Sequence, residues 1–413
     1  MKVIDKYASY DIRVEVIEFE VPLDYSNTTE KINVVIKVVN KIKNKTNKFI
    51  LYLQGGPGFA SPFPTSSSDP GYINPLLDRG YTVILLDQRG TGLSTVIDTD
   101  VLISKGNVNA QFEYLKNFRA DSIVLDCECI RKELEIEKWY LLGQSFGGFV
   151  SISYASFFPD SLEAIFLTGG LPPIAINDVT EVYTQTFKRT KEREDAYYAK
   201  FPQDEERIEF ILNQNEIIPA QFNRLGMTLG ASGGSVNLHG LVLAMFTDFK
   251  LLGRLSTKVK RDYENYLGFE QNILYALFQE AIYINGPGIK SDWAAEKLIT
   301  SGFTGEIVDS QMFDTYSKLR PLKGLAHHIH QYENWSIIYN IENLKTITWD
   351  RLPIIAQVYL DDQYVDYELG RRNYELFSHK QIVTNQLFHN GLRSDSVNVI
   401  NALHKVLEQG EYI

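Results

Sequence analysis

The sequence predicts a doubly wound α/β fold, a mostly parallel sheet with helices on both faces, that carries a mostly helical cap. Short apolar runs, typical of strands buried on both faces of a parallel sheet, alternate with segments of helical spacing. A long stretch in the second half has helical patterns and few strand-like runs, after which buried strands resume. The predicted core is therefore residues 1–170 with 349–413, and the predicted cap is residues 171–348.

The elements of the core follow from periodicity. Residues 12–40 alternate apolar and polar side chains, which predicts two antiparallel strands joined by a turn near residues 24–29. Continuous apolar runs then predict buried strands. In chain order, the further predicted elements are strands at 49–54 and 81–87, helical spacing over 110–137, strands at 139–143, 162–170, 352–361 and 381–386, and a final helix over 397–410.

Composition excludes several classes of protein. Of 413 residues, 44% are hydrophobic and 23% are charged, as in soluble globular proteins. The net charge of −11 argues against nucleic acid and anionic membranes as partners. No apolar run reaches the roughly 18 residues of a membrane helix, and residues 1–16 lack the apolar centre of a signal peptide. Cys127 and Cys129, two apart on a predicted helix, point in different directions. Unpaired thiols fit the cytoplasm, which is the predicted location.

Ser145 is the candidate nucleophile. It lies in the pattern Gly143-x-Ser145-x-Gly147, which follows a buried strand and precedes a helical segment. Strand, sharp turn and helix are the context of a nucleophile elbow, in which the serine backbone is strained and the glycines avoid clashes. The alternative is a strand-to-helix turn that happens to contain a serine.

A serine hydroxyl needs a base beside it, and the base needs a carboxylate to orient it. After an elbow serine the expected order is an acid and then a histidine. Asp361 and Asp362 end one predicted strand, and His389 follows the next. Both places are carboxyl ends of sheet strands, where open α/β sheets form their sites. We expect Asp362 to orient His389, because it begins the loop, and Asp361 to be a capping or solvated carboxylate.

An oxyanion hole requires backbone N–H groups aimed at the developing charge. One is expected from Phe146, the residue after the nucleophile. The second is expected from the glycine-rich loop after the strand at 49–54, with Gly56 the preferred donor and Gly55 the alternative. Taken alone, this loop would equally fit a plain turn.

Three motifs, in this order and spacing, resemble the proline iminopeptidases of the α/β-hydrolase superfamily: LYLQGGPGFASP, ILLDQRGTGLS and LLGQSFGGF. The later segments EAIY, FTGE, VYLDDQYVD and HNGLR resemble the longer-chain branch of that family. The resemblance implies the α/β-hydrolase fold and release of N-terminal proline from short peptides, and this chemistry needs no metal or organic cofactor. By position, Ser145, Asp362 and His389 match the triad of the family. Gln54 stands where the wider family usually has histidine.

Recognition of a free α-amine calls for carboxylates near the site. The predicted cap offers Glu280 and Glu306, whose spacing resembles that of the two cap glutamates that bind the amine in the family. The alternative for either glutamate is a solvated helix face.

Two further motifs have a structural and a functional interpretation. Asp87-Gln88-Arg89-Gly90 is expected to support the oxyanion loop, for example through hydrogen bonds from Arg89 to backbone carbonyls, and otherwise is an ordinary turn. The run His327-His328-x-His330 has the residue type of a metal site, but it lacks a cysteine and its members cannot share one helix face. We expect it to lie on the surface of the cap.

Three functions remain open to the sequence. The first is a serine exopeptidase that acts through an acyl-enzyme intermediate. The second keeps the triad but hydrolyses other substrates, as an esterase, lactonase or amidase. The third is a binding protein on a hydrolase fold whose chemistry is dead, although the chain retains a candidate for every triad position.

Overall fold

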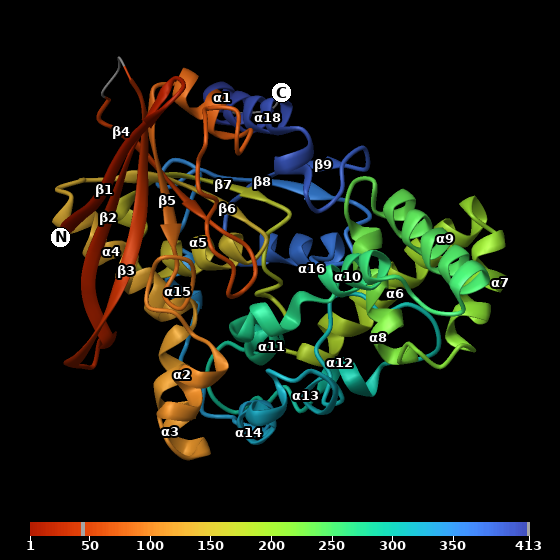
Figure 1. Cartoon of the computed structure of the whole chain (residues 1–413). Helices are drawn as coiled ribbons and strands as arrows, with labels where there is room; N and C mark the ends of the chain where they lie inside the picture. Colours follow the sequence, from red (N-terminus) through yellow and green to blue (C-terminus); the bar gives the residue numbers. More distant parts are fainter. Residues whose placement is uncertain (43–45, 411–413) are drawn as a thin grey trace.

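The computed structural model describes residues 1–42 and 46–410. Their strands form one nine-stranded sheet in the order β1-β2-β3-β5-β4-β6-β7-β8-β9 (Figure 1). β1, β2, β3 and β5 pair antiparallel in turn, whereas β5, β4, β6, β7, β8 and β9 pair parallel. The strands are β1 (Lys2–Ser9), β2 (Ile12–Asp24), β3 (Asn27–Lys41), β4 (Lys48–Leu53), β5 (Tyr81–Asp87), β6 (Trp139–Gln144), β7 (Leu162–Thr168), β8 (Ile354–Tyr359) and β9 (Lys380–Thr384).

Helices cover both faces of this sheet, as the continuous apolar strands require. On β4, Ile50 and Tyr52 pack with α1 and α18, while Leu51 and Leu53 pack on the other face with α4 and α5. The core helices are α1 (Ile73–Asp78), α2 (Thr99–Ser104), α3 (Val108–Leu115), α4 (Ala120–Glu133), α5 (Phe146–Phe157), α16 (Tyr367–Arg371), α17 (Gly391–Ser394) and α18 (Ser396–Gln409). The predicted doubly wound α/β fold is confirmed.

Two features of the core differ from the sequence prediction. β1 was not predicted, because this edge strand is largely exposed and lacks an alternating apolar face. The helical spacing over 110–137 belongs to two helices, α3 and α4, which are separated at Arg119. There the backbone is extended (ψ 177°), and the buried guanidinium donates to the carbonyls of Ala281 and Ile284. A long-range contact thus ends a pattern that would locally continue as one helix.

Between β7 and β8 the described chain forms helices and no strand, and most of these helices gather to one side of the sheet (Figure 1). The division into a core and a cap at residues 171–348 remains a prediction. Within residues 1–42 and 46–410, no helix combines the length and the apolar character needed to cross a bilayer. The helices of this stretch are α6 (Val179–Lys200), α7 (Gln203–Leu212), α8 (Pro219–Asn223), α9 (Gly234–Leu252), α10 (Thr257–Asn265), α11 (Ile273–Phe278), α12 (Ala294–Lys297), α13 (Met312–Thr315), α14 (Lys323–Gln331) and α15 (Ile341–Leu344).

A buried ion pair joins the antiparallel strands to the helical layer. The side chains of Arg89 and Asp126 are both 0% exposed, and the Nε of Arg89 donates to the Asp126 carboxylate over 2.7 Å. Arg89 also donates to the carbonyls of Leu23, at the end of β2, and of Asn117, just before α4. Since each charge here has its partner, the pair can remain ionised in the core.

We expect Arg89→Met to lower the free energy of unfolding by about 3–5 kcal/mol, because it leaves Asp126 buried and unpaired. Arg371→Met is the matched control, since the Arg371–Glu368 pair is exposed (58% and 46%) and should change stability by less than about 1 kcal/mol. Urea unfolding of both variants measures the difference. Equal losses in the two variants would contradict the importance of the buried pair.

Candidate active site

Ser145 stands at the turn between β6 and α5 in a strained backbone conformation. Its φ is 54° and its ψ is −126°, a combination that a residue with a Cβ rarely adopts. The turn is held on both sides, because the Ser145 amide donates to the Thr168 carbonyl (3.1 Å) and the Ser145 carbonyl accepts from the Gly148 amide (2.7 Å). These two hydrogen bonds hold the strained serine at the carboxyl end of the sheet.

The glycines of the motif are required by close packing. A Cβ on Gly147 would lie 1.9 Å from the carbonyl oxygen of Leu53, at the end of β4. A Cβ on Gly143 would lie 2.5 Å from the Gly147 carbonyl oxygen. No real Cβ tolerates such distances to backbone atoms. Without these two side chains the helix can start directly against the neighbouring strand.

The structure brings Ser145, His389 and Asp362 into one hydrogen-bonded chain. His389 Nε2 lies 2.9 Å from Ser145 Oγ, and His389 Nδ1 lies 2.7 Å from Asp362 Oδ2. An ionised carboxylate can only accept, so Nδ1 carries the proton and Nε2 is free to accept from the serine hydroxyl. This is the arrangement that activates a serine nucleophile.

Asp362, and not Asp361, faces the imidazole. Oδ1 of Asp362 accepts from the amides of Tyr364 (2.8 Å) and Val365 (3.2 Å), which leaves Oδ2 for His389. Asp361 is 45% exposed and pairs with Arg193 of α6 over 3.0 Å. A second arginine of α6, Arg189, pairs with the buried Asp366 (2.9 Å) on the far side of the same loop.

The surroundings of His389 tune its protonation. Burial alone would lower the pKa of the imidazole, but the charge and hydrogen bond of Asp362, together with the charge of Glu306, raise it above its ordinary value. The ring of Tyr364 also packs against the imidazole, with centroids 4.5 Å apart. His389 is thus oriented from two sides and disposed to take up a proton.

The glycine-rich loop after β4 runs beside the serine, as an oxyanion hole requires. A Cβ on Gly55 would lie 2.9 Å from the Cβ of Ser145, and Gly55 and Gly56 both line the pocket that contains Ser145. Phe146 is the first residue of α5, so its amide has no acceptor within the helix. Which of the two glycines would donate beside Phe146 remains a prediction.

Support of this loop comes from the predicted motif, but not from Arg89, whose carbonyl partners lie elsewhere. Gln88 Nε2 donates to the carbonyl of Gln54 (3.0 Å), just before the glycines. Asp87 accepts from the amide of Ser61 (2.9 Å), beyond them. The expectation for Arg89 was wrong because its guanidinium is bonded instead to the buried carboxylate of Asp126 and to carbonyls away from the loop. Gln88 and Asp87 anchor the two ends of the loop instead.

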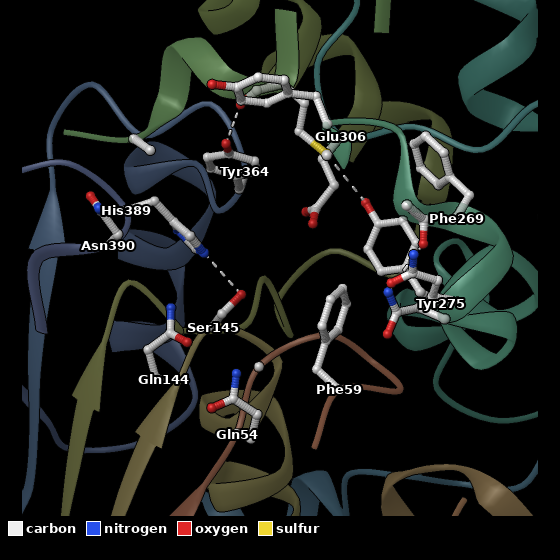
Figure 2. Close-up of a pocket in the computed structure, with 18 of the residues that line it drawn as sticks. Gln54, Phe59, Gln144, Ser145, Phe269, Tyr275, Glu306, Tyr364, His389 and Asn390 are labelled. Atoms are coloured by element: carbon white, nitrogen blue, oxygen red, sulfur yellow. Dashed lines mark hydrogen bonds between the residues drawn. The ribbon is translucent and has the colours of Figure 1, made fainter. Parts of the chain in front are cut away.

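A pocket of about 410 Å³ opens above the serine (Figure 2). Figure 2 shows Glu306, Tyr275 and Phe269 across the space from Ser145 and His389. One wall comes from the sheet edge and the other from the helical stretch between β7 and β8. The lining residues are Gln54, Gly55, Gly56, Phe59, Gln144, Ser145, Met227, Ala231, Asn265, Tyr266, Gly268, Phe269, Gln271, Asn272, Tyr275, Glu306, Tyr364, His389, Asn390 and Arg393.

Glu306 lines this pocket, and its carboxyl group is an unusually weak acid. Burial raises its pKa to about 7, and the nearby charge of His389 opposes that rise. Among the lining residues it is the one carboxylate. A cation brought next to Glu306 would favour its ionised form.

Glu280 does not reach the pocket. Its carboxylate accepts from the amides of Ala294 (3.1 Å) and Ala295 (2.9 Å) at the start of α12, and lies 3.0 Å from Nδ1 of His330. Its side chain is 0% exposed. The expectation that Glu280 binds a substrate amine is corrected, since other groups of the protein already occupy both of its carboxylate oxygens.

The histidine run is not a surface feature throughout. His327 is exposed, but His330 is buried between Glu280 and the ring of Trp293, with ring centroids 3.5 Å apart. In the part of the chain that the structure describes, no three His, Cys, Asp or Glu side chains converge as metal ligands would. The correction for His330 follows from α14, which turns this residue inward and His327 outward.

Several pocket residues were not predicted. Tyr275, Tyr364 and Arg393 line the pocket, but the sequence analysis gave none of them a role, although Tyr364 and Arg393 lie within the segments VYLDDQYVD and HNGLR. The available signals were the positions of Tyr364 and Arg393, a few residues after Asp362 and His389. Loop residues near triad members face the same space by proximity.

Comparisons with known proteins found a matching family model and similar relatives. A family model described as alpha/beta hydrolase fold matches residues 48–208. The proline iminopeptidase aneH of Aspergillus aculeatus is 32% identical, with 98% of this chain and 97% of that protein covered. The proline iminopeptidase of Aeromonas sobria is 36% identical, with 86% of each covered. The crystal structure of the Mycobacterium smegmatis proline iminopeptidase is 15% identical, covers 95% of this chain and 98% of its own, and has a TM-score of 0.44, too low to support a closer comparison.

We expect Asp362→Asn to slow the labelling of Ser145 by a fluorophosphonate on the order of 10⁴-fold, because the amide would favour the wrong tautomer of His389. Asp361→Asn is the matched control and should keep the rate within a few-fold. Labelling rates are read by mass spectrometry of the intact folded protein. A larger loss in Asp361→Asn than in Asp362→Asn would assign the orienting acid differently.

Proposed function

Since the chain belongs to the proline iminopeptidase family of the α/β-hydrolase superfamily, as its two long relatives show, we propose that Ser145, His389 and Asp362 hydrolyse peptides that begin with proline. The family makes the chain a hydrolase, a prolyl aminopeptidase. The observation that carries the residue assignment is the hydrogen-bonded chain from Ser145 through His389 to Asp362 at the floor of the pocket.

The proposed reaction proceeds by acyl transfer. Ser145 Oγ attacks the carbonyl carbon of the first residue while His389 Nε2 takes the hydroxyl proton. The amides of Phe146 and of Gly56 or Gly55 stabilise the oxyanion. The imidazolium then gives its proton to the leaving amine, and the remaining peptide departs. Water, deprotonated by His389, hydrolyses the ester on Ser145 and releases the amino acid.

Glu306 supplies the exopeptidase character in this proposal. An N-terminal proline carries a positively charged secondary amine, and Glu306 is the carboxylate that lines the pocket. Tyr275, Phe269 and Tyr364 line the same space and offer apolar surface to a proline ring. Glu280, which the sequence offered as a second amine ligand, is not included, because its oxygens are bonded to Ala294, Ala295 and His330.

The principal alternative is an esterase, lactonase or amidase with the same triad. A pocket for neutral substrates would not require a carboxylate that burial penalises, which favours the peptidase. Hydrolysis of proline-4-nitroanilide and of N-acetylproline-4-nitroanilide distinguishes the peptidase from this alternative. We expect hydrolysis of the first only, lost in Ser145→Ala, and a panel of aminoacyl arylamides then ranks the first residue. Equal hydrolysis of both compounds would favour the alternative.

We expect Glu306→Gln to raise the KM for a prolyl arylamide by about tenfold to a hundredfold, because a charge-assisted hydrogen bond becomes a neutral one. A neutral acetate ester, hydrolysed by the same triad, should show little change in KM. Steady-state kinetics on both substrates give the comparison. Equal effects on both would remove the amine-binding role from Glu306.

The pH dependence of kcat/KM should also show that ionised Glu306 is needed for the prolyl substrate. Below about pH 7 Glu306 is protonated in the free enzyme, so kcat/KM for the prolyl arylamide should fall with the uptake of two protons, one on Glu306 and one on His389. The neutral ester should depend on His389 alone, with a slope of one proton. A slope of one for the prolyl substrate would contradict the prediction, since it would mean that ionised Glu306 is not needed.

A further inference from the structure

The pocket contains a second fixed charge, of opposite sign to Glu306. Arg393, in α17, lines the pocket four residues after His389 in the chain. Apart from His389, it is the only cationic side chain among the lining residues, and Glu306 is the only acid. The pocket therefore has one anionic and one cationic group around the serine.

Arg393 has no acidic partner. Within residues 1–42 and 46–410, its guanidinium forms no ion pair with a carboxylate, and its protein partner is the neutral hydroxyl of Tyr52. The contrast is with Arg89 and Arg224, both buried and paired with aspartates. The Arg393 side chain is exposed, whereas Glu306 is half-buried. The cation is thus the more exposed of the two charged groups that line the pocket.

His389 lies within the field of both charges. Glu306 raises the pKa of the imidazole and Arg393 lowers it. Both groups therefore act electrostatically on the imidazole that transfers the proton. Asn390, between His389 and Arg393 in the chain, is held by a hydrogen bond from the Ser232 amide to its side chain (2.9 Å). That contact holds the residue that immediately precedes α17, the helix that contains Arg393.

We propose that Arg393 binds the C-terminal carboxylate of the shortest substrates, so that the enzyme prefers zwitterionic dipeptides that begin with proline. The inference rests on the proposed function: the amine lies at Glu306, the scissile carbonyl at Ser145 and the carboxylate at Arg393. A planar guanidinium with unused donors matches a carboxylate in a bidentate manner. An extended dipeptide spans about 7 Å, so both of its end charges lie close to the reacting carbonyl, and Glu306 and Arg393 both line the pocket that contains Ser145.

The size of the pocket agrees with a small substrate. Its volume of about 410 Å³ is at the lower end of the range of about 300–1,000 Å³ for ligand pockets. In a longer peptide the terminal carboxylate moves out of reach of Arg393, and in an amidated peptide it is absent. The preference should therefore decline from dipeptide to tripeptide and be smallest for amides.

The test compares prolylglycine with prolylglycinamide in wild type, Arg393→Gln and Arg393→Lys. We expect Arg393→Gln to lower the ratio of the two kcat/KM values, acid over amide, by about threefold to tenfold, chiefly through KM. Arg393→Lys keeps the charge and should retain part of the ratio. The change in ratio between enzymes is decisive, because the different basicity of the two leaving amines cancels in it. Salt should weaken the effect.

Arg261→Gln is the matched control, since Arg261 is exposed on α10, outside the pocket lining, and its loss changes the net charge equally. It should leave the ratio unchanged. Equal losses of Arg393→Gln on acid and amide would overturn the role of Arg393 while leaving the prolyl activity in place. Absence of hydrolysis of both dipeptides and of proline-4-nitroanilide by the wild type would instead overturn the proposed function.

Discussion

The candidate site depends on the contact between the turn at Ser145 and the two neighbouring strands. Gly147 lies against the carbonyl of Leu53 on β4, and the Ser145 amide is bonded to Thr168 at the end of β7. The glycine-rich loop begins immediately after Leu53, so the same contact that admits α5 also places this loop beside the serine. A side chain at Gly147 would separate the nucleophile from the loop. The position of the proposed oxyanion donors is thus a consequence of backbone packing.

The two charged groups of the pocket differ in their exposure to water. Glu306 lies among tyrosines, and burial weakens its acidity, so the free enzyme holds it near the midpoint of its titration at neutral pH. Arg393, by contrast, is exposed to water. The ammonium of a substrate would complete the ionisation of Glu306. Binding of the amine is therefore linked to release of a proton from the protein.

Much of the core and the triad could be predicted from the sequence, because both depend on local patterns. Buried strands appear as continuous apolar runs, and the elbow appears as a glycine-flanked serine between a strand and a helix. Asp362 could be preferred over Asp361 from its place at the start of a loop. By contrast, Arg89, Glu280 and His330 have roles set by partners far away in the chain. Their burial results from packing between segments that are far apart in the sequence. The local hydrophobic periodicity of a segment does not indicate which distant segment it will contact.

Two arginines of α6 form ion pairs with the loop that carries Asp362. Arg193 pairs with Asp361, before Asp362, and Arg189 pairs with Asp366, after it. These two ion pairs tie one long helix from outside the sheet to the loop from which Asp362 reaches His389. The position of the orienting carboxylate is therefore braced by a segment that lies far from it in the sequence.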